Sequence, residues 1–116
     1  MNATSLDTSF LATATDATLE DWGPLAQATG PAMRVSGTVI WRDGAQEAGV
    51  WSCGPGPSHW TVANNQFVYV LYGRMTVTAD GGEPAEIGPG DTAVFPRGWS
   101  GTWVIHETIR QLYVVF

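Results

Sequence analysis

Two histidines and a single cysteine are the side chains in this chain whose types are best suited to direct chemistry. A histidine with a pKa of about 6.5 can act as a general base or as a hydrogen-bonding contact near neutral pH. His59 follows the Gly/Pro-rich stretch 54–57, so it is either a chemical residue or a loop-end residue with no chemical role. Cys53 would be a nucleophile only if a neighbouring base lowered its pKa, and no such base lies near it in the sequence. Because lone cysteines are among the most buried residue types, we expect Cys53 in the core.

Aromatic side chains form a second group of candidates, because the chain contains six tryptophans. Four of them, Trp51, Trp60, Trp99 and Trp103, could stack on a planar or sugar-like ligand, or could simply fill the interior. Trp99 follows the Pro96–Gly98 turn, where side chains often remain accessible. Arg97 in the same turn either clamps a carboxylate or is solvated. Asp91 is expected to serve its own turn.

Strand-like alternation of apolar and polar residues begins near Met33 and continues to the end of the chain. Short segments of this kind, separated by Gly, Pro and Asn turns, are typical of an all-β sandwich or closed antiparallel barrel. The expected strands cover 34–42, 49–53, 59–62, 66–72 with a continuation over 74–79, 85–87, 92–95, 102–105 and 109–116. A hairpin turn is expected at Asp43-Gly44 and another at 80–82.

The first 32 residues predict an arm that precedes a single barrel domain over 33–116. Residues 1–18 are rich in Thr, Ala and Ser without a sustained period, which is typical of a flexible or loosely docked segment. A short helical turn is expected over 18–27, because Thr18 could cap it with Asp21 three residues later. Gly23-Pro24 interrupts this pattern.

Composition excludes several classes of partner. The five basic residues, all Arg, face eleven acidic ones, and the net charge of −6 disfavours nucleic acid and anionic membranes. The apolar runs are too short to span a bilayer, and the first residues lack the basic head of a signal peptide. One cysteine cannot form an internal disulfide. We therefore expect a cytoplasmic protein.

The segment 67–72 predicts self-association. Its residues are apolar on both parities, so both faces of the strand should be buried. A barrel wall buries only its inner face within one subunit. The outer face is then covered by a second copy in a homodimer, or by residues 19–41 of the same chain.

Four stretches together resemble a cupin domain: 51–53 with its Gly/Pro loop, 66–73, 87–91 and 95–103. Within the cupin superfamily, the region from Gly49 to Phe116 is similar to the small single-domain group related to ureidoglycine aminohydrolase. The resemblance implies an RmlC-like antiparallel jelly roll with a pocket inside, often dimeric.

The resemblance also bears on a metal site. Metal-binding cupins usually supply three histidines and one carboxylate, a set suited to Mn, Fe, Ni or Zn. With Gly73 and the 96–98 turn setting the register, the four ligand positions fall on His59, Thr61, Gln66 and Gly101. Only His59 is retained, so the resemblance implies a degenerate site without a tightly bound metal. His106 does not repair the site, because Trp103 and Ile105 continue the face of Gly101 and leave His106 on the other.

Three functions remain open at this point. The first is metal-free binding of a small polar metabolite in a pocket of the barrel, formed by His59, Thr61, Gln66, Trp51, Trp99, Trp103 and Gly101. The alternative is an enzyme: either a metal-dependent hydrolase resembling ureidoglycine aminohydrolase, or a metal-free acid–base enzyme for a sugar or keto acid. His59 would then act with Tyr72, which should share the face of Gln66, rather than with Tyr69. The third is a structural dimer whose barrel is packed solid.

Overall fold

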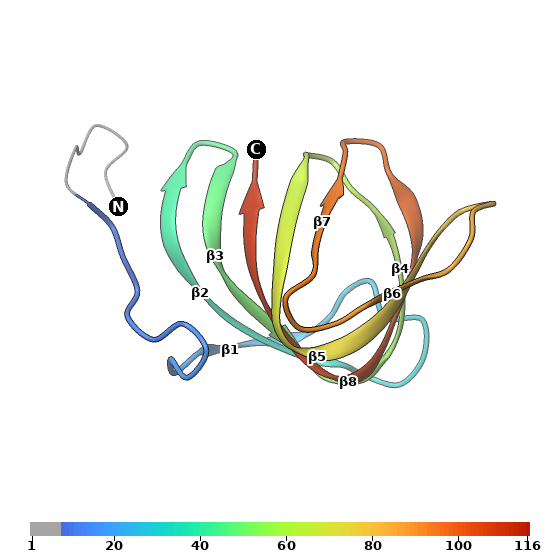
Figure 1. The fold of residues 1–116 in the computed structure, drawn as a ribbon, viewed down its shortest axis with the longest axis horizontal. Coiled ribbons are helices and arrows are strands. Elements are labelled where there is room, and N and C mark those ends of the chain that lie inside the picture. The colour runs from blue at the N-terminus through green and yellow to red at the C-terminus, as the bar shows by residue number, and fades with distance from the viewer. Residues whose placement is uncertain (1–7) are drawn as a thin grey trace.

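The computed structural model describes residues 8–116, which form one antiparallel sheet of eight strands and contain no helix (Figure 1). The strands are β1 (Glu20–Pro24), β2 (Arg34–Asp43), β3 (Gln46–Cys53), β4 (Gly56–Thr61), β5 (Gln66–Ala79), β6 (Ala85–Ile87), β7 (Thr92–Phe95) and β8 (Ser100–Val115). The expected all-β barrel is confirmed. No helix in this part of the chain is long and apolar enough to cross a bilayer.

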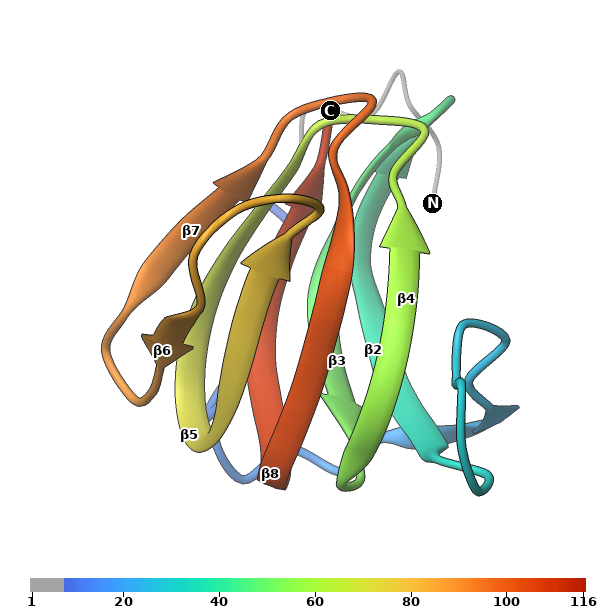
Figure 2. The ribbon, with the colours of Figure 1, turned by 90° about the vertical axis from the view of Figure 1, so that its right-hand side faces the viewer.

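The two longest strands organise the sheet. β5 and β8 pair along nearly their whole lengths, from Gln66 opposite Val115 to Ala79 opposite Gly101. The C-terminal half of β8 also pairs with β3, and its N-terminal half pairs with β4. Both long strands bend strongly, so the sheet turns back on itself in a U-shaped cross-section with the other strands as its walls (Figures 1 and 2).

The bend coincides with irregular pairing between β5 and β8. The register shifts between Val70 and Tyr72, and again on both sides of Arg74. Gly73 lies at this point with a φ of 90°, and a Cβ there would stand 2.6 Å from the Cα of Ile109. Only glycine fits both the backbone conformation and this close approach. The expected strands 102–105 and 109–116 are therefore one bent strand.

The concave side of the sheet carries the core. Val68, Val70, Met75 and Val77 of β5 lie on it and are buried. The inner residues of the other strands pack against them: Met33, Val35, Cys53, Val62, Phe95, Trp103, Ile105 and Ile109, with Leu25 from the segment after β1. The two-residue alternation of β5 thus places apolar side chains inside on each side of the bend, with a change of parity between Val70 and Met75.

The N-terminal segment differs from its expectation. The helical turn over 18–27 is wrong, because β1 occupies this region and pairs with β2. Asp21, expected to support a helix cap, instead forms an ion pair with Arg34 and accepts a hydrogen bond of 2.9 Å from the Gly23 amide. Gly and Pro are poor helix formers, so pairing with an available sheet edge prevails. Residues 1–7 of the expected arm lie outside the described residues.

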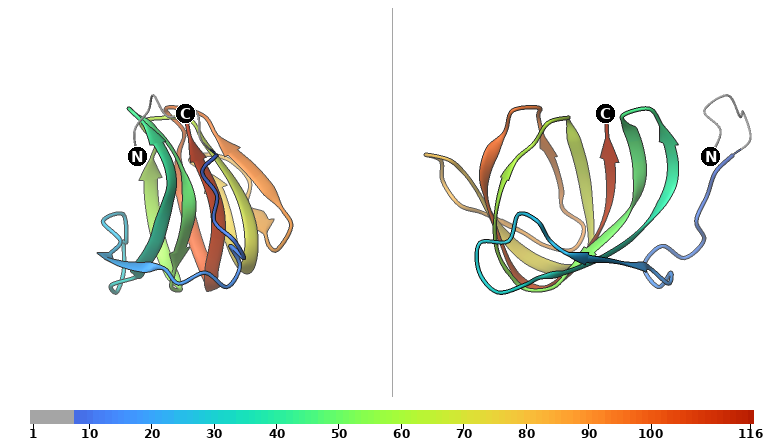
Figure 3. Two further views of the ribbon diagram at one scale, coloured as in Figure 1. Left: turned by 90° about the vertical axis from the view of Figure 1, so that its left-hand side faces the viewer. Right: turned by 180° about the vertical axis from the view of Figure 1, so that it is seen from behind.

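Arg110 of β8 fixes the segment before β1. Its guanidinium donates to the carbonyls of Ala14 and Ala17 over 3.0 and 2.9 Å. The segment thereby lies over the outer side of β8, as the left panel of Figure 3 shows. This contact covers part of the convex side of the sheet and leaves the region beyond it open.

The outer side of β5 is only partly covered. Phe67 and Leu71 are half-buried, and Tyr69 is 37% exposed. Across the pairing, Phe67 lies between Val94 of β7, 56% exposed, and Val114 of β8, 38% exposed. The expected burial of both faces is therefore not achieved by residues 8–116 alone.

Cys53 tests the packing of the core. Burial raises the pKa of its thiol to about 11, and the side chain is 1% exposed. At pH 8 about one thiol in a thousand is then ionised, so we expect iodoacetamide to alkylate Cys53 at least ~100-fold more slowly in the folded chain than in urea. Mass spectrometry of timed samples measures both rates. Equal rates would contradict the buried position.

Candidate functional site

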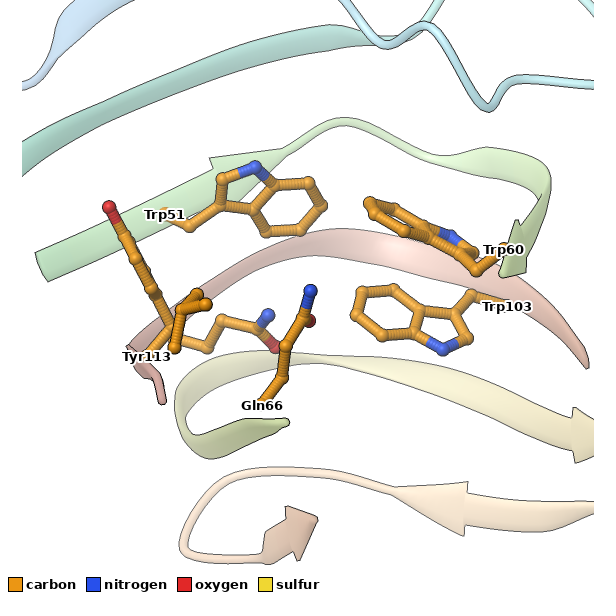
Figure 4. A pocket seen from close by; sticks show the side chains of 7 residues that line it. Trp51, Trp60, Gln66, Trp103 and Tyr113 are labelled. Atoms are coloured by element: carbon orange, nitrogen blue, oxygen red, sulfur yellow. The ribbon is translucent and has the colours of Figure 1, made fainter. Parts of the chain in front are cut away.

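The concave side of the sheet encloses a cavity of about 130 Å³. Figure 4 shows Trp51 and Tyr113 toward one end, the Trp60 and Trp103 rings toward the other, and Gln66 between them. The remaining lining residues are Gln111 and Val115. Among the described residues, the side chains that line it carry no charge. The cavity is therefore aromatic, with two carboxamides and one phenol as its side-chain oxygen groups.

The strand register brings these residues together. Gln111 of β8 lies opposite Trp51 of β3 on one side and opposite Val70 of β5 on the other. Gln66 begins β5 opposite Val115. Because paired residues in antiparallel strands point to the same face, the inward positions of β3, β5 and β8 converge on the cavity.

The tryptophans pack against one another in fixed orientations. Trp60 stacks on Trp103 with ring centroids 4.5 Å apart and planes at 29°. Trp51 meets this pair edge-on, with centroids 6.2 Å from Trp60 and 6.1 Å from Trp103. Such contacts stabilise beyond simple burial by about 0.5–1.5 kcal/mol each. The aromatic wall is preformed before any ligand enters.

Two polar atoms of this wall have no hydrogen-bond partner among the described residues. They are Oε1 of Gln111 and Nε1 of Trp103. As whole residues, Gln111 and Trp103 are 3% and 1% exposed. Leaving a buried polar group unpaired costs roughly 1–3 kcal/mol. By contrast, the Trp60 indole donates to Ser58 Oγ over 2.8 Å. Two of the residues that line the cavity thus each carry a buried polar atom without a protein partner.

Tyr113 links the cavity to a charged pair at its edge. Its hydroxyl donates to Glu47 of β3, and Arg42 of β2 donates to the other oxygen of that carboxylate over 2.8 Å. Burial raises the pKa of Tyr113 above its usual range, and the hydrogen bond to Glu47 adds to this effect. The phenol therefore stays protonated at neutral pH, with its proton directed at Glu47.

His59 and Thr61 do not lie in the cavity. Both side chains are on the outer face of β4, whose inward residues are Ser58 and Trp60. The register inferred from the cupin resemblance is displaced by one residue at this strand, because β4 already begins at Gly56 within the Gly/Pro loop. Trp60, rather than His59, faces the pocket.

The outer position gives His59 acidic and hydroxyl neighbours. Its Nε2 lies 3.2 Å from Asp80 Oδ1, and Ser100 Oγ donates to Asp80 Oδ2 over 2.7 Å. The hydrogen bonds from Ser100 and then His59 hold the pKa of Asp80 below its usual range. Asp80 lies between the other two, so no hydrogen bond of this cluster joins the serine to the imidazole. The cluster lacks the contact that activates a nucleophile.

The ring of Trp99 lies directly beside Gly101. A Cβ on Gly101 would stand 2.5 Å from Cη2 of Trp99, so the ring of Trp99 fills the space that a side chain at 101 would need. Trp99 also packs edge-on against Phe95 at 4.8 Å. Both residues belong to the packed interior beside the cavity, while Trp51, Trp103 and Gln66 line it as expected.

The remaining candidates lie outside the cavity. His106 points outward, as expected, and its Nε2 lies 2.7 Å from Thr76 Oγ1. Tyr72 was expected to share the face of Gln66, but the register shift after Val70 turns it outward, where the Arg110 guanidinium lies 5.6 Å from its ring. Tyr69 is also outside the cavity.

The two turn residues also lie outside the cavity. Arg97 is exposed, and Asp91 accepts from the Gly88 amide over 2.8 Å within its own turn.

Comparison with known proteins agrees with this architecture. Residues 41–113 match the family model of the EutQ-like cupin domain. The chain belongs to the EutQ-like cupin family. No curated protein matches the chain.

Solved structures share the cupin fold. The EutQ protein of Clostridium difficile is 16% identical with a TM-score of 0.72, covering 86% of this chain and 80% of that one. A putative ethanolamine utilization protein of Salmonella typhimurium is 25% identical with a TM-score of 0.66, covering 81% and 76%. A Pseudomonas syringae protein of unknown function is 20% identical with a TM-score of 0.78, over 86% of this chain but 45% of that one. This cupin chain spans less than half the length of the Pseudomonas protein.

The pocket of this cupin does not suit a transition metal. Its side-chain oxygens belong to Gln66, Gln111 and Tyr113, whereas Mn, Fe, Ni and Zn prefer imidazole, carboxylate or thiolate ligands. Within residues 8–116, no group of three or more His, Cys, Asp and Glu side chains could hold a metal ion.

Gln111, Tyr113 and Val115 are pocket residues that the sequence reasoning did not identify. The signal was present, because the two-residue period that relates Gly101, Trp103 and Ile105 continues through Ile109 to these three positions. The polar run 106–108 concealed it by suggesting a turn. Tracing one parity through β8 recovers the whole inward set.

Substitution of Gly101 tests the packing beside the cavity. We expect Gly101→Ala to destabilise the fold by about 1–3 kcal/mol, because the added methyl group would collide with the Thr78 carbonyl oxygen and with the ring of Trp99. The matched control is Gly54→Ala, whose Cβ would meet nothing closer than the Arg34 nitrogen at 4.0 Å. Urea unfolding followed by tryptophan fluorescence measures both. Equal stability of the two variants would contradict the assigned packing.

Proposed function

We propose that this cupin binds a small polar organic molecule in the aromatic cavity without a tightly bound metal. The observation that carries this proposal is the preformed aromatic cavity itself, two of whose lining residues, Gln111 and Trp103, each have a buried polar atom without a protein partner. A polar core residue without a partner is costly, so its presence beside an open volume favours a partner supplied from outside.

The size of the cavity supports a small ligand. A volume of about 130 Å³ is close to that of an engineered protein cavity of roughly 150 Å³ that admits benzene. A ligand portion with on the order of six to eight non-hydrogen atoms fits. The open volume also argues against a barrel packed solid, which was the structural alternative.

His59, the residue on which the enzyme alternative depends, does not line the cavity. Acid–base chemistry on a pocket ligand requires the base within hydrogen-bond reach of that ligand. The imidazole of His59 lies on the opposite face of β4 and is engaged with Asp80. His59 therefore serves better as a control position than as a catalytic candidate.

Gln111→Leu separates a functional polar group from a structural one. We expect this variant to unfold at higher urea concentration, with the free energy of unfolding raised by about 1 kcal/mol, because the unpaired carboxamide is removed. We expect it also to lose the thermal stabilisation that pocket ligands from a metabolite collection give to the unaltered chain. A strongly destabilised variant that still responds to the same ligands would contradict the proposal.

His59→Ala is the matched control, and we expect it to keep the ligand response. Addition of Mn, Fe, Ni or Zn to chelator-treated protein is expected to leave the melting temperature unchanged. If a metal raises the melting temperature and no organic compound does, metal-free binding is wrong.

We also propose a homodimer formed through the outer apolar face, defined here as Phe67, Tyr69, Val94, Leu112 and Val114. The face carries no charge, while the chain as a whole carries −6. An uncharged face is therefore best matched by the same face of a second copy, and one self-complementary patch suffices for a two-fold interface. Its exposed side chains are of the kind that mark protein interfaces.

A charge placed in this face tests the homodimer. We expect the chain to be dimeric at tens of micromolar in light scattering, and Val94→Glu to be monomeric, because two carboxylates would be buried opposite each other. Gln46→Glu adds the same charge in the exposed β2–β3 hairpin and should leave the dimer intact. A monomeric unaltered chain, or a dimeric Val94→Glu, would overturn the proposal.

A further inference from the structure

The cavity wall has a definite electrostatic character although it contains no charged side chain. Tryptophan rings present faces that are negative relative to their edges, and three tryptophans line this volume. An organic anion would need Arg or Lys for recognition, and neither contributes to the lining. The wall is therefore suited to a cation more than to an anion.

Tyr113 strengthens this preference. Its hydroxyl donates to Glu47, so the phenol oxygen keeps a lone pair with which it can accept a further hydrogen bond. Glu47 adds a carboxylate immediately behind the phenol, and its side chain is 25% exposed. Arg42 offsets part of that charge from the far side of the carboxylate, 2.6 Å away. The negative end of this chain of contacts thus lies nearest the cavity.

The carboxamides complete the site without deciding the sign of the ligand. Gln111 Oε1 is buried without a partner and can accept from a ligand N–H or stabilise a positive charge. The Gln66 carboxamide can present either its oxygen as an acceptor or its NH2 group as a donor.

We propose that the ligand of this pocket is a small organic cation, a substituted ammonium whose head group lies against Trp51 and Tyr113. This inference depends on the proposed ligand-binding function and specifies its chemical class. Aromatic side chains that surround a desolvated volume are the recurrent means by which proteins bind such head groups. The cavity volume of about 130 Å³ suits an ammonium with a short polar tail.

Two probes of the same shape isolate the contribution of the charge. Choline and its uncharged carbon isostere 3,3-dimethylbutan-1-ol are titrated calorimetrically into the full chain, with acetate as the anionic comparison. We expect choline to bind at least about tenfold more tightly than the isostere, which is the difference that a desolvated cation–π contact supplies. Acetate should not bind.

Two variants assign the preference to named residues. Trp51→Leu keeps an apolar wall but removes the aromatic face, so choline should weaken about tenfold while the isostere changes little. Glu47→Gln keeps the size of the side chain and removes the charge, so choline should weaken several-fold. Circular dichroism and urea midpoints establish that each variant is folded. If Trp51→Leu does not fold, Glu47→Gln and Trp51→Phe carry the comparison.

The outcomes separate the two proposals. Equal or tighter binding of the isostere overturns the cation assignment and leaves pocket binding intact. If only neutral metabolites bind, and Gln111→Leu abolishes that binding, the cation assignment is likewise overturned and pocket binding stands. If neither probe binds and no metabolite stabilises the chain, the ligand-binding function itself fails.

Discussion

The pairing of β5 with β8 is the constraint on which the rest of this structure depends. These strands run together through the bend, so every inward side chain of the two walls is placed by one ladder. Gly73 makes the bend possible, because a side chain there would collide with the backbone of β8. With the ladder fixed, β3 and β4 add to opposite ends of β8 and bring Trp51 and Trp60 toward each other. The aromatic cluster is thus a product of strand register, and its rings need no loop to position them.

Local pattern predicted the regular parts of this fold well. The strand-like residues of 66–79 and 92–95 are bounded by turn residues, and β5 and β7 fall where that pattern places them. Prediction failed where a local preference competed with pairing to a distant strand. The 18–27 segment has a capping pattern, but the free edge of β2 offers backbone hydrogen bonds that an isolated helical turn with Gly23-Pro24 cannot match.

The site was harder to predict than the fold, because a displacement of one residue exchanges the two faces of a strand. At β4 the loop before His59 hid where the strand begins, so the outward histidine was taken for an inward one. At β5 the shift after Val70 carried Tyr72 to the outside. Gln66, Trp51 and Trp103 line the cavity because none of them is separated from its neighbours in the strand by such a shift. Pairing irregularities depend on contacts between distant residues, and single-sequence periodicity does not contain them.

The continuity of β8 has a consequence for how this pocket tolerates change in length. Its odd-numbered residues from 109 to 115 face inward, and the even-numbered Arg110, Leu112 and Val114 face outward. Loss of a single residue from the segment 106–108 would exchange these two sets while the strand could still pair. The cavity would then be lined by aliphatic side chains and a guanidinium, and the carboxamide and phenol would face solvent. Substitutions change the lining of this pocket one side chain at a time, whereas a deletion here would replace several lining side chains in one step.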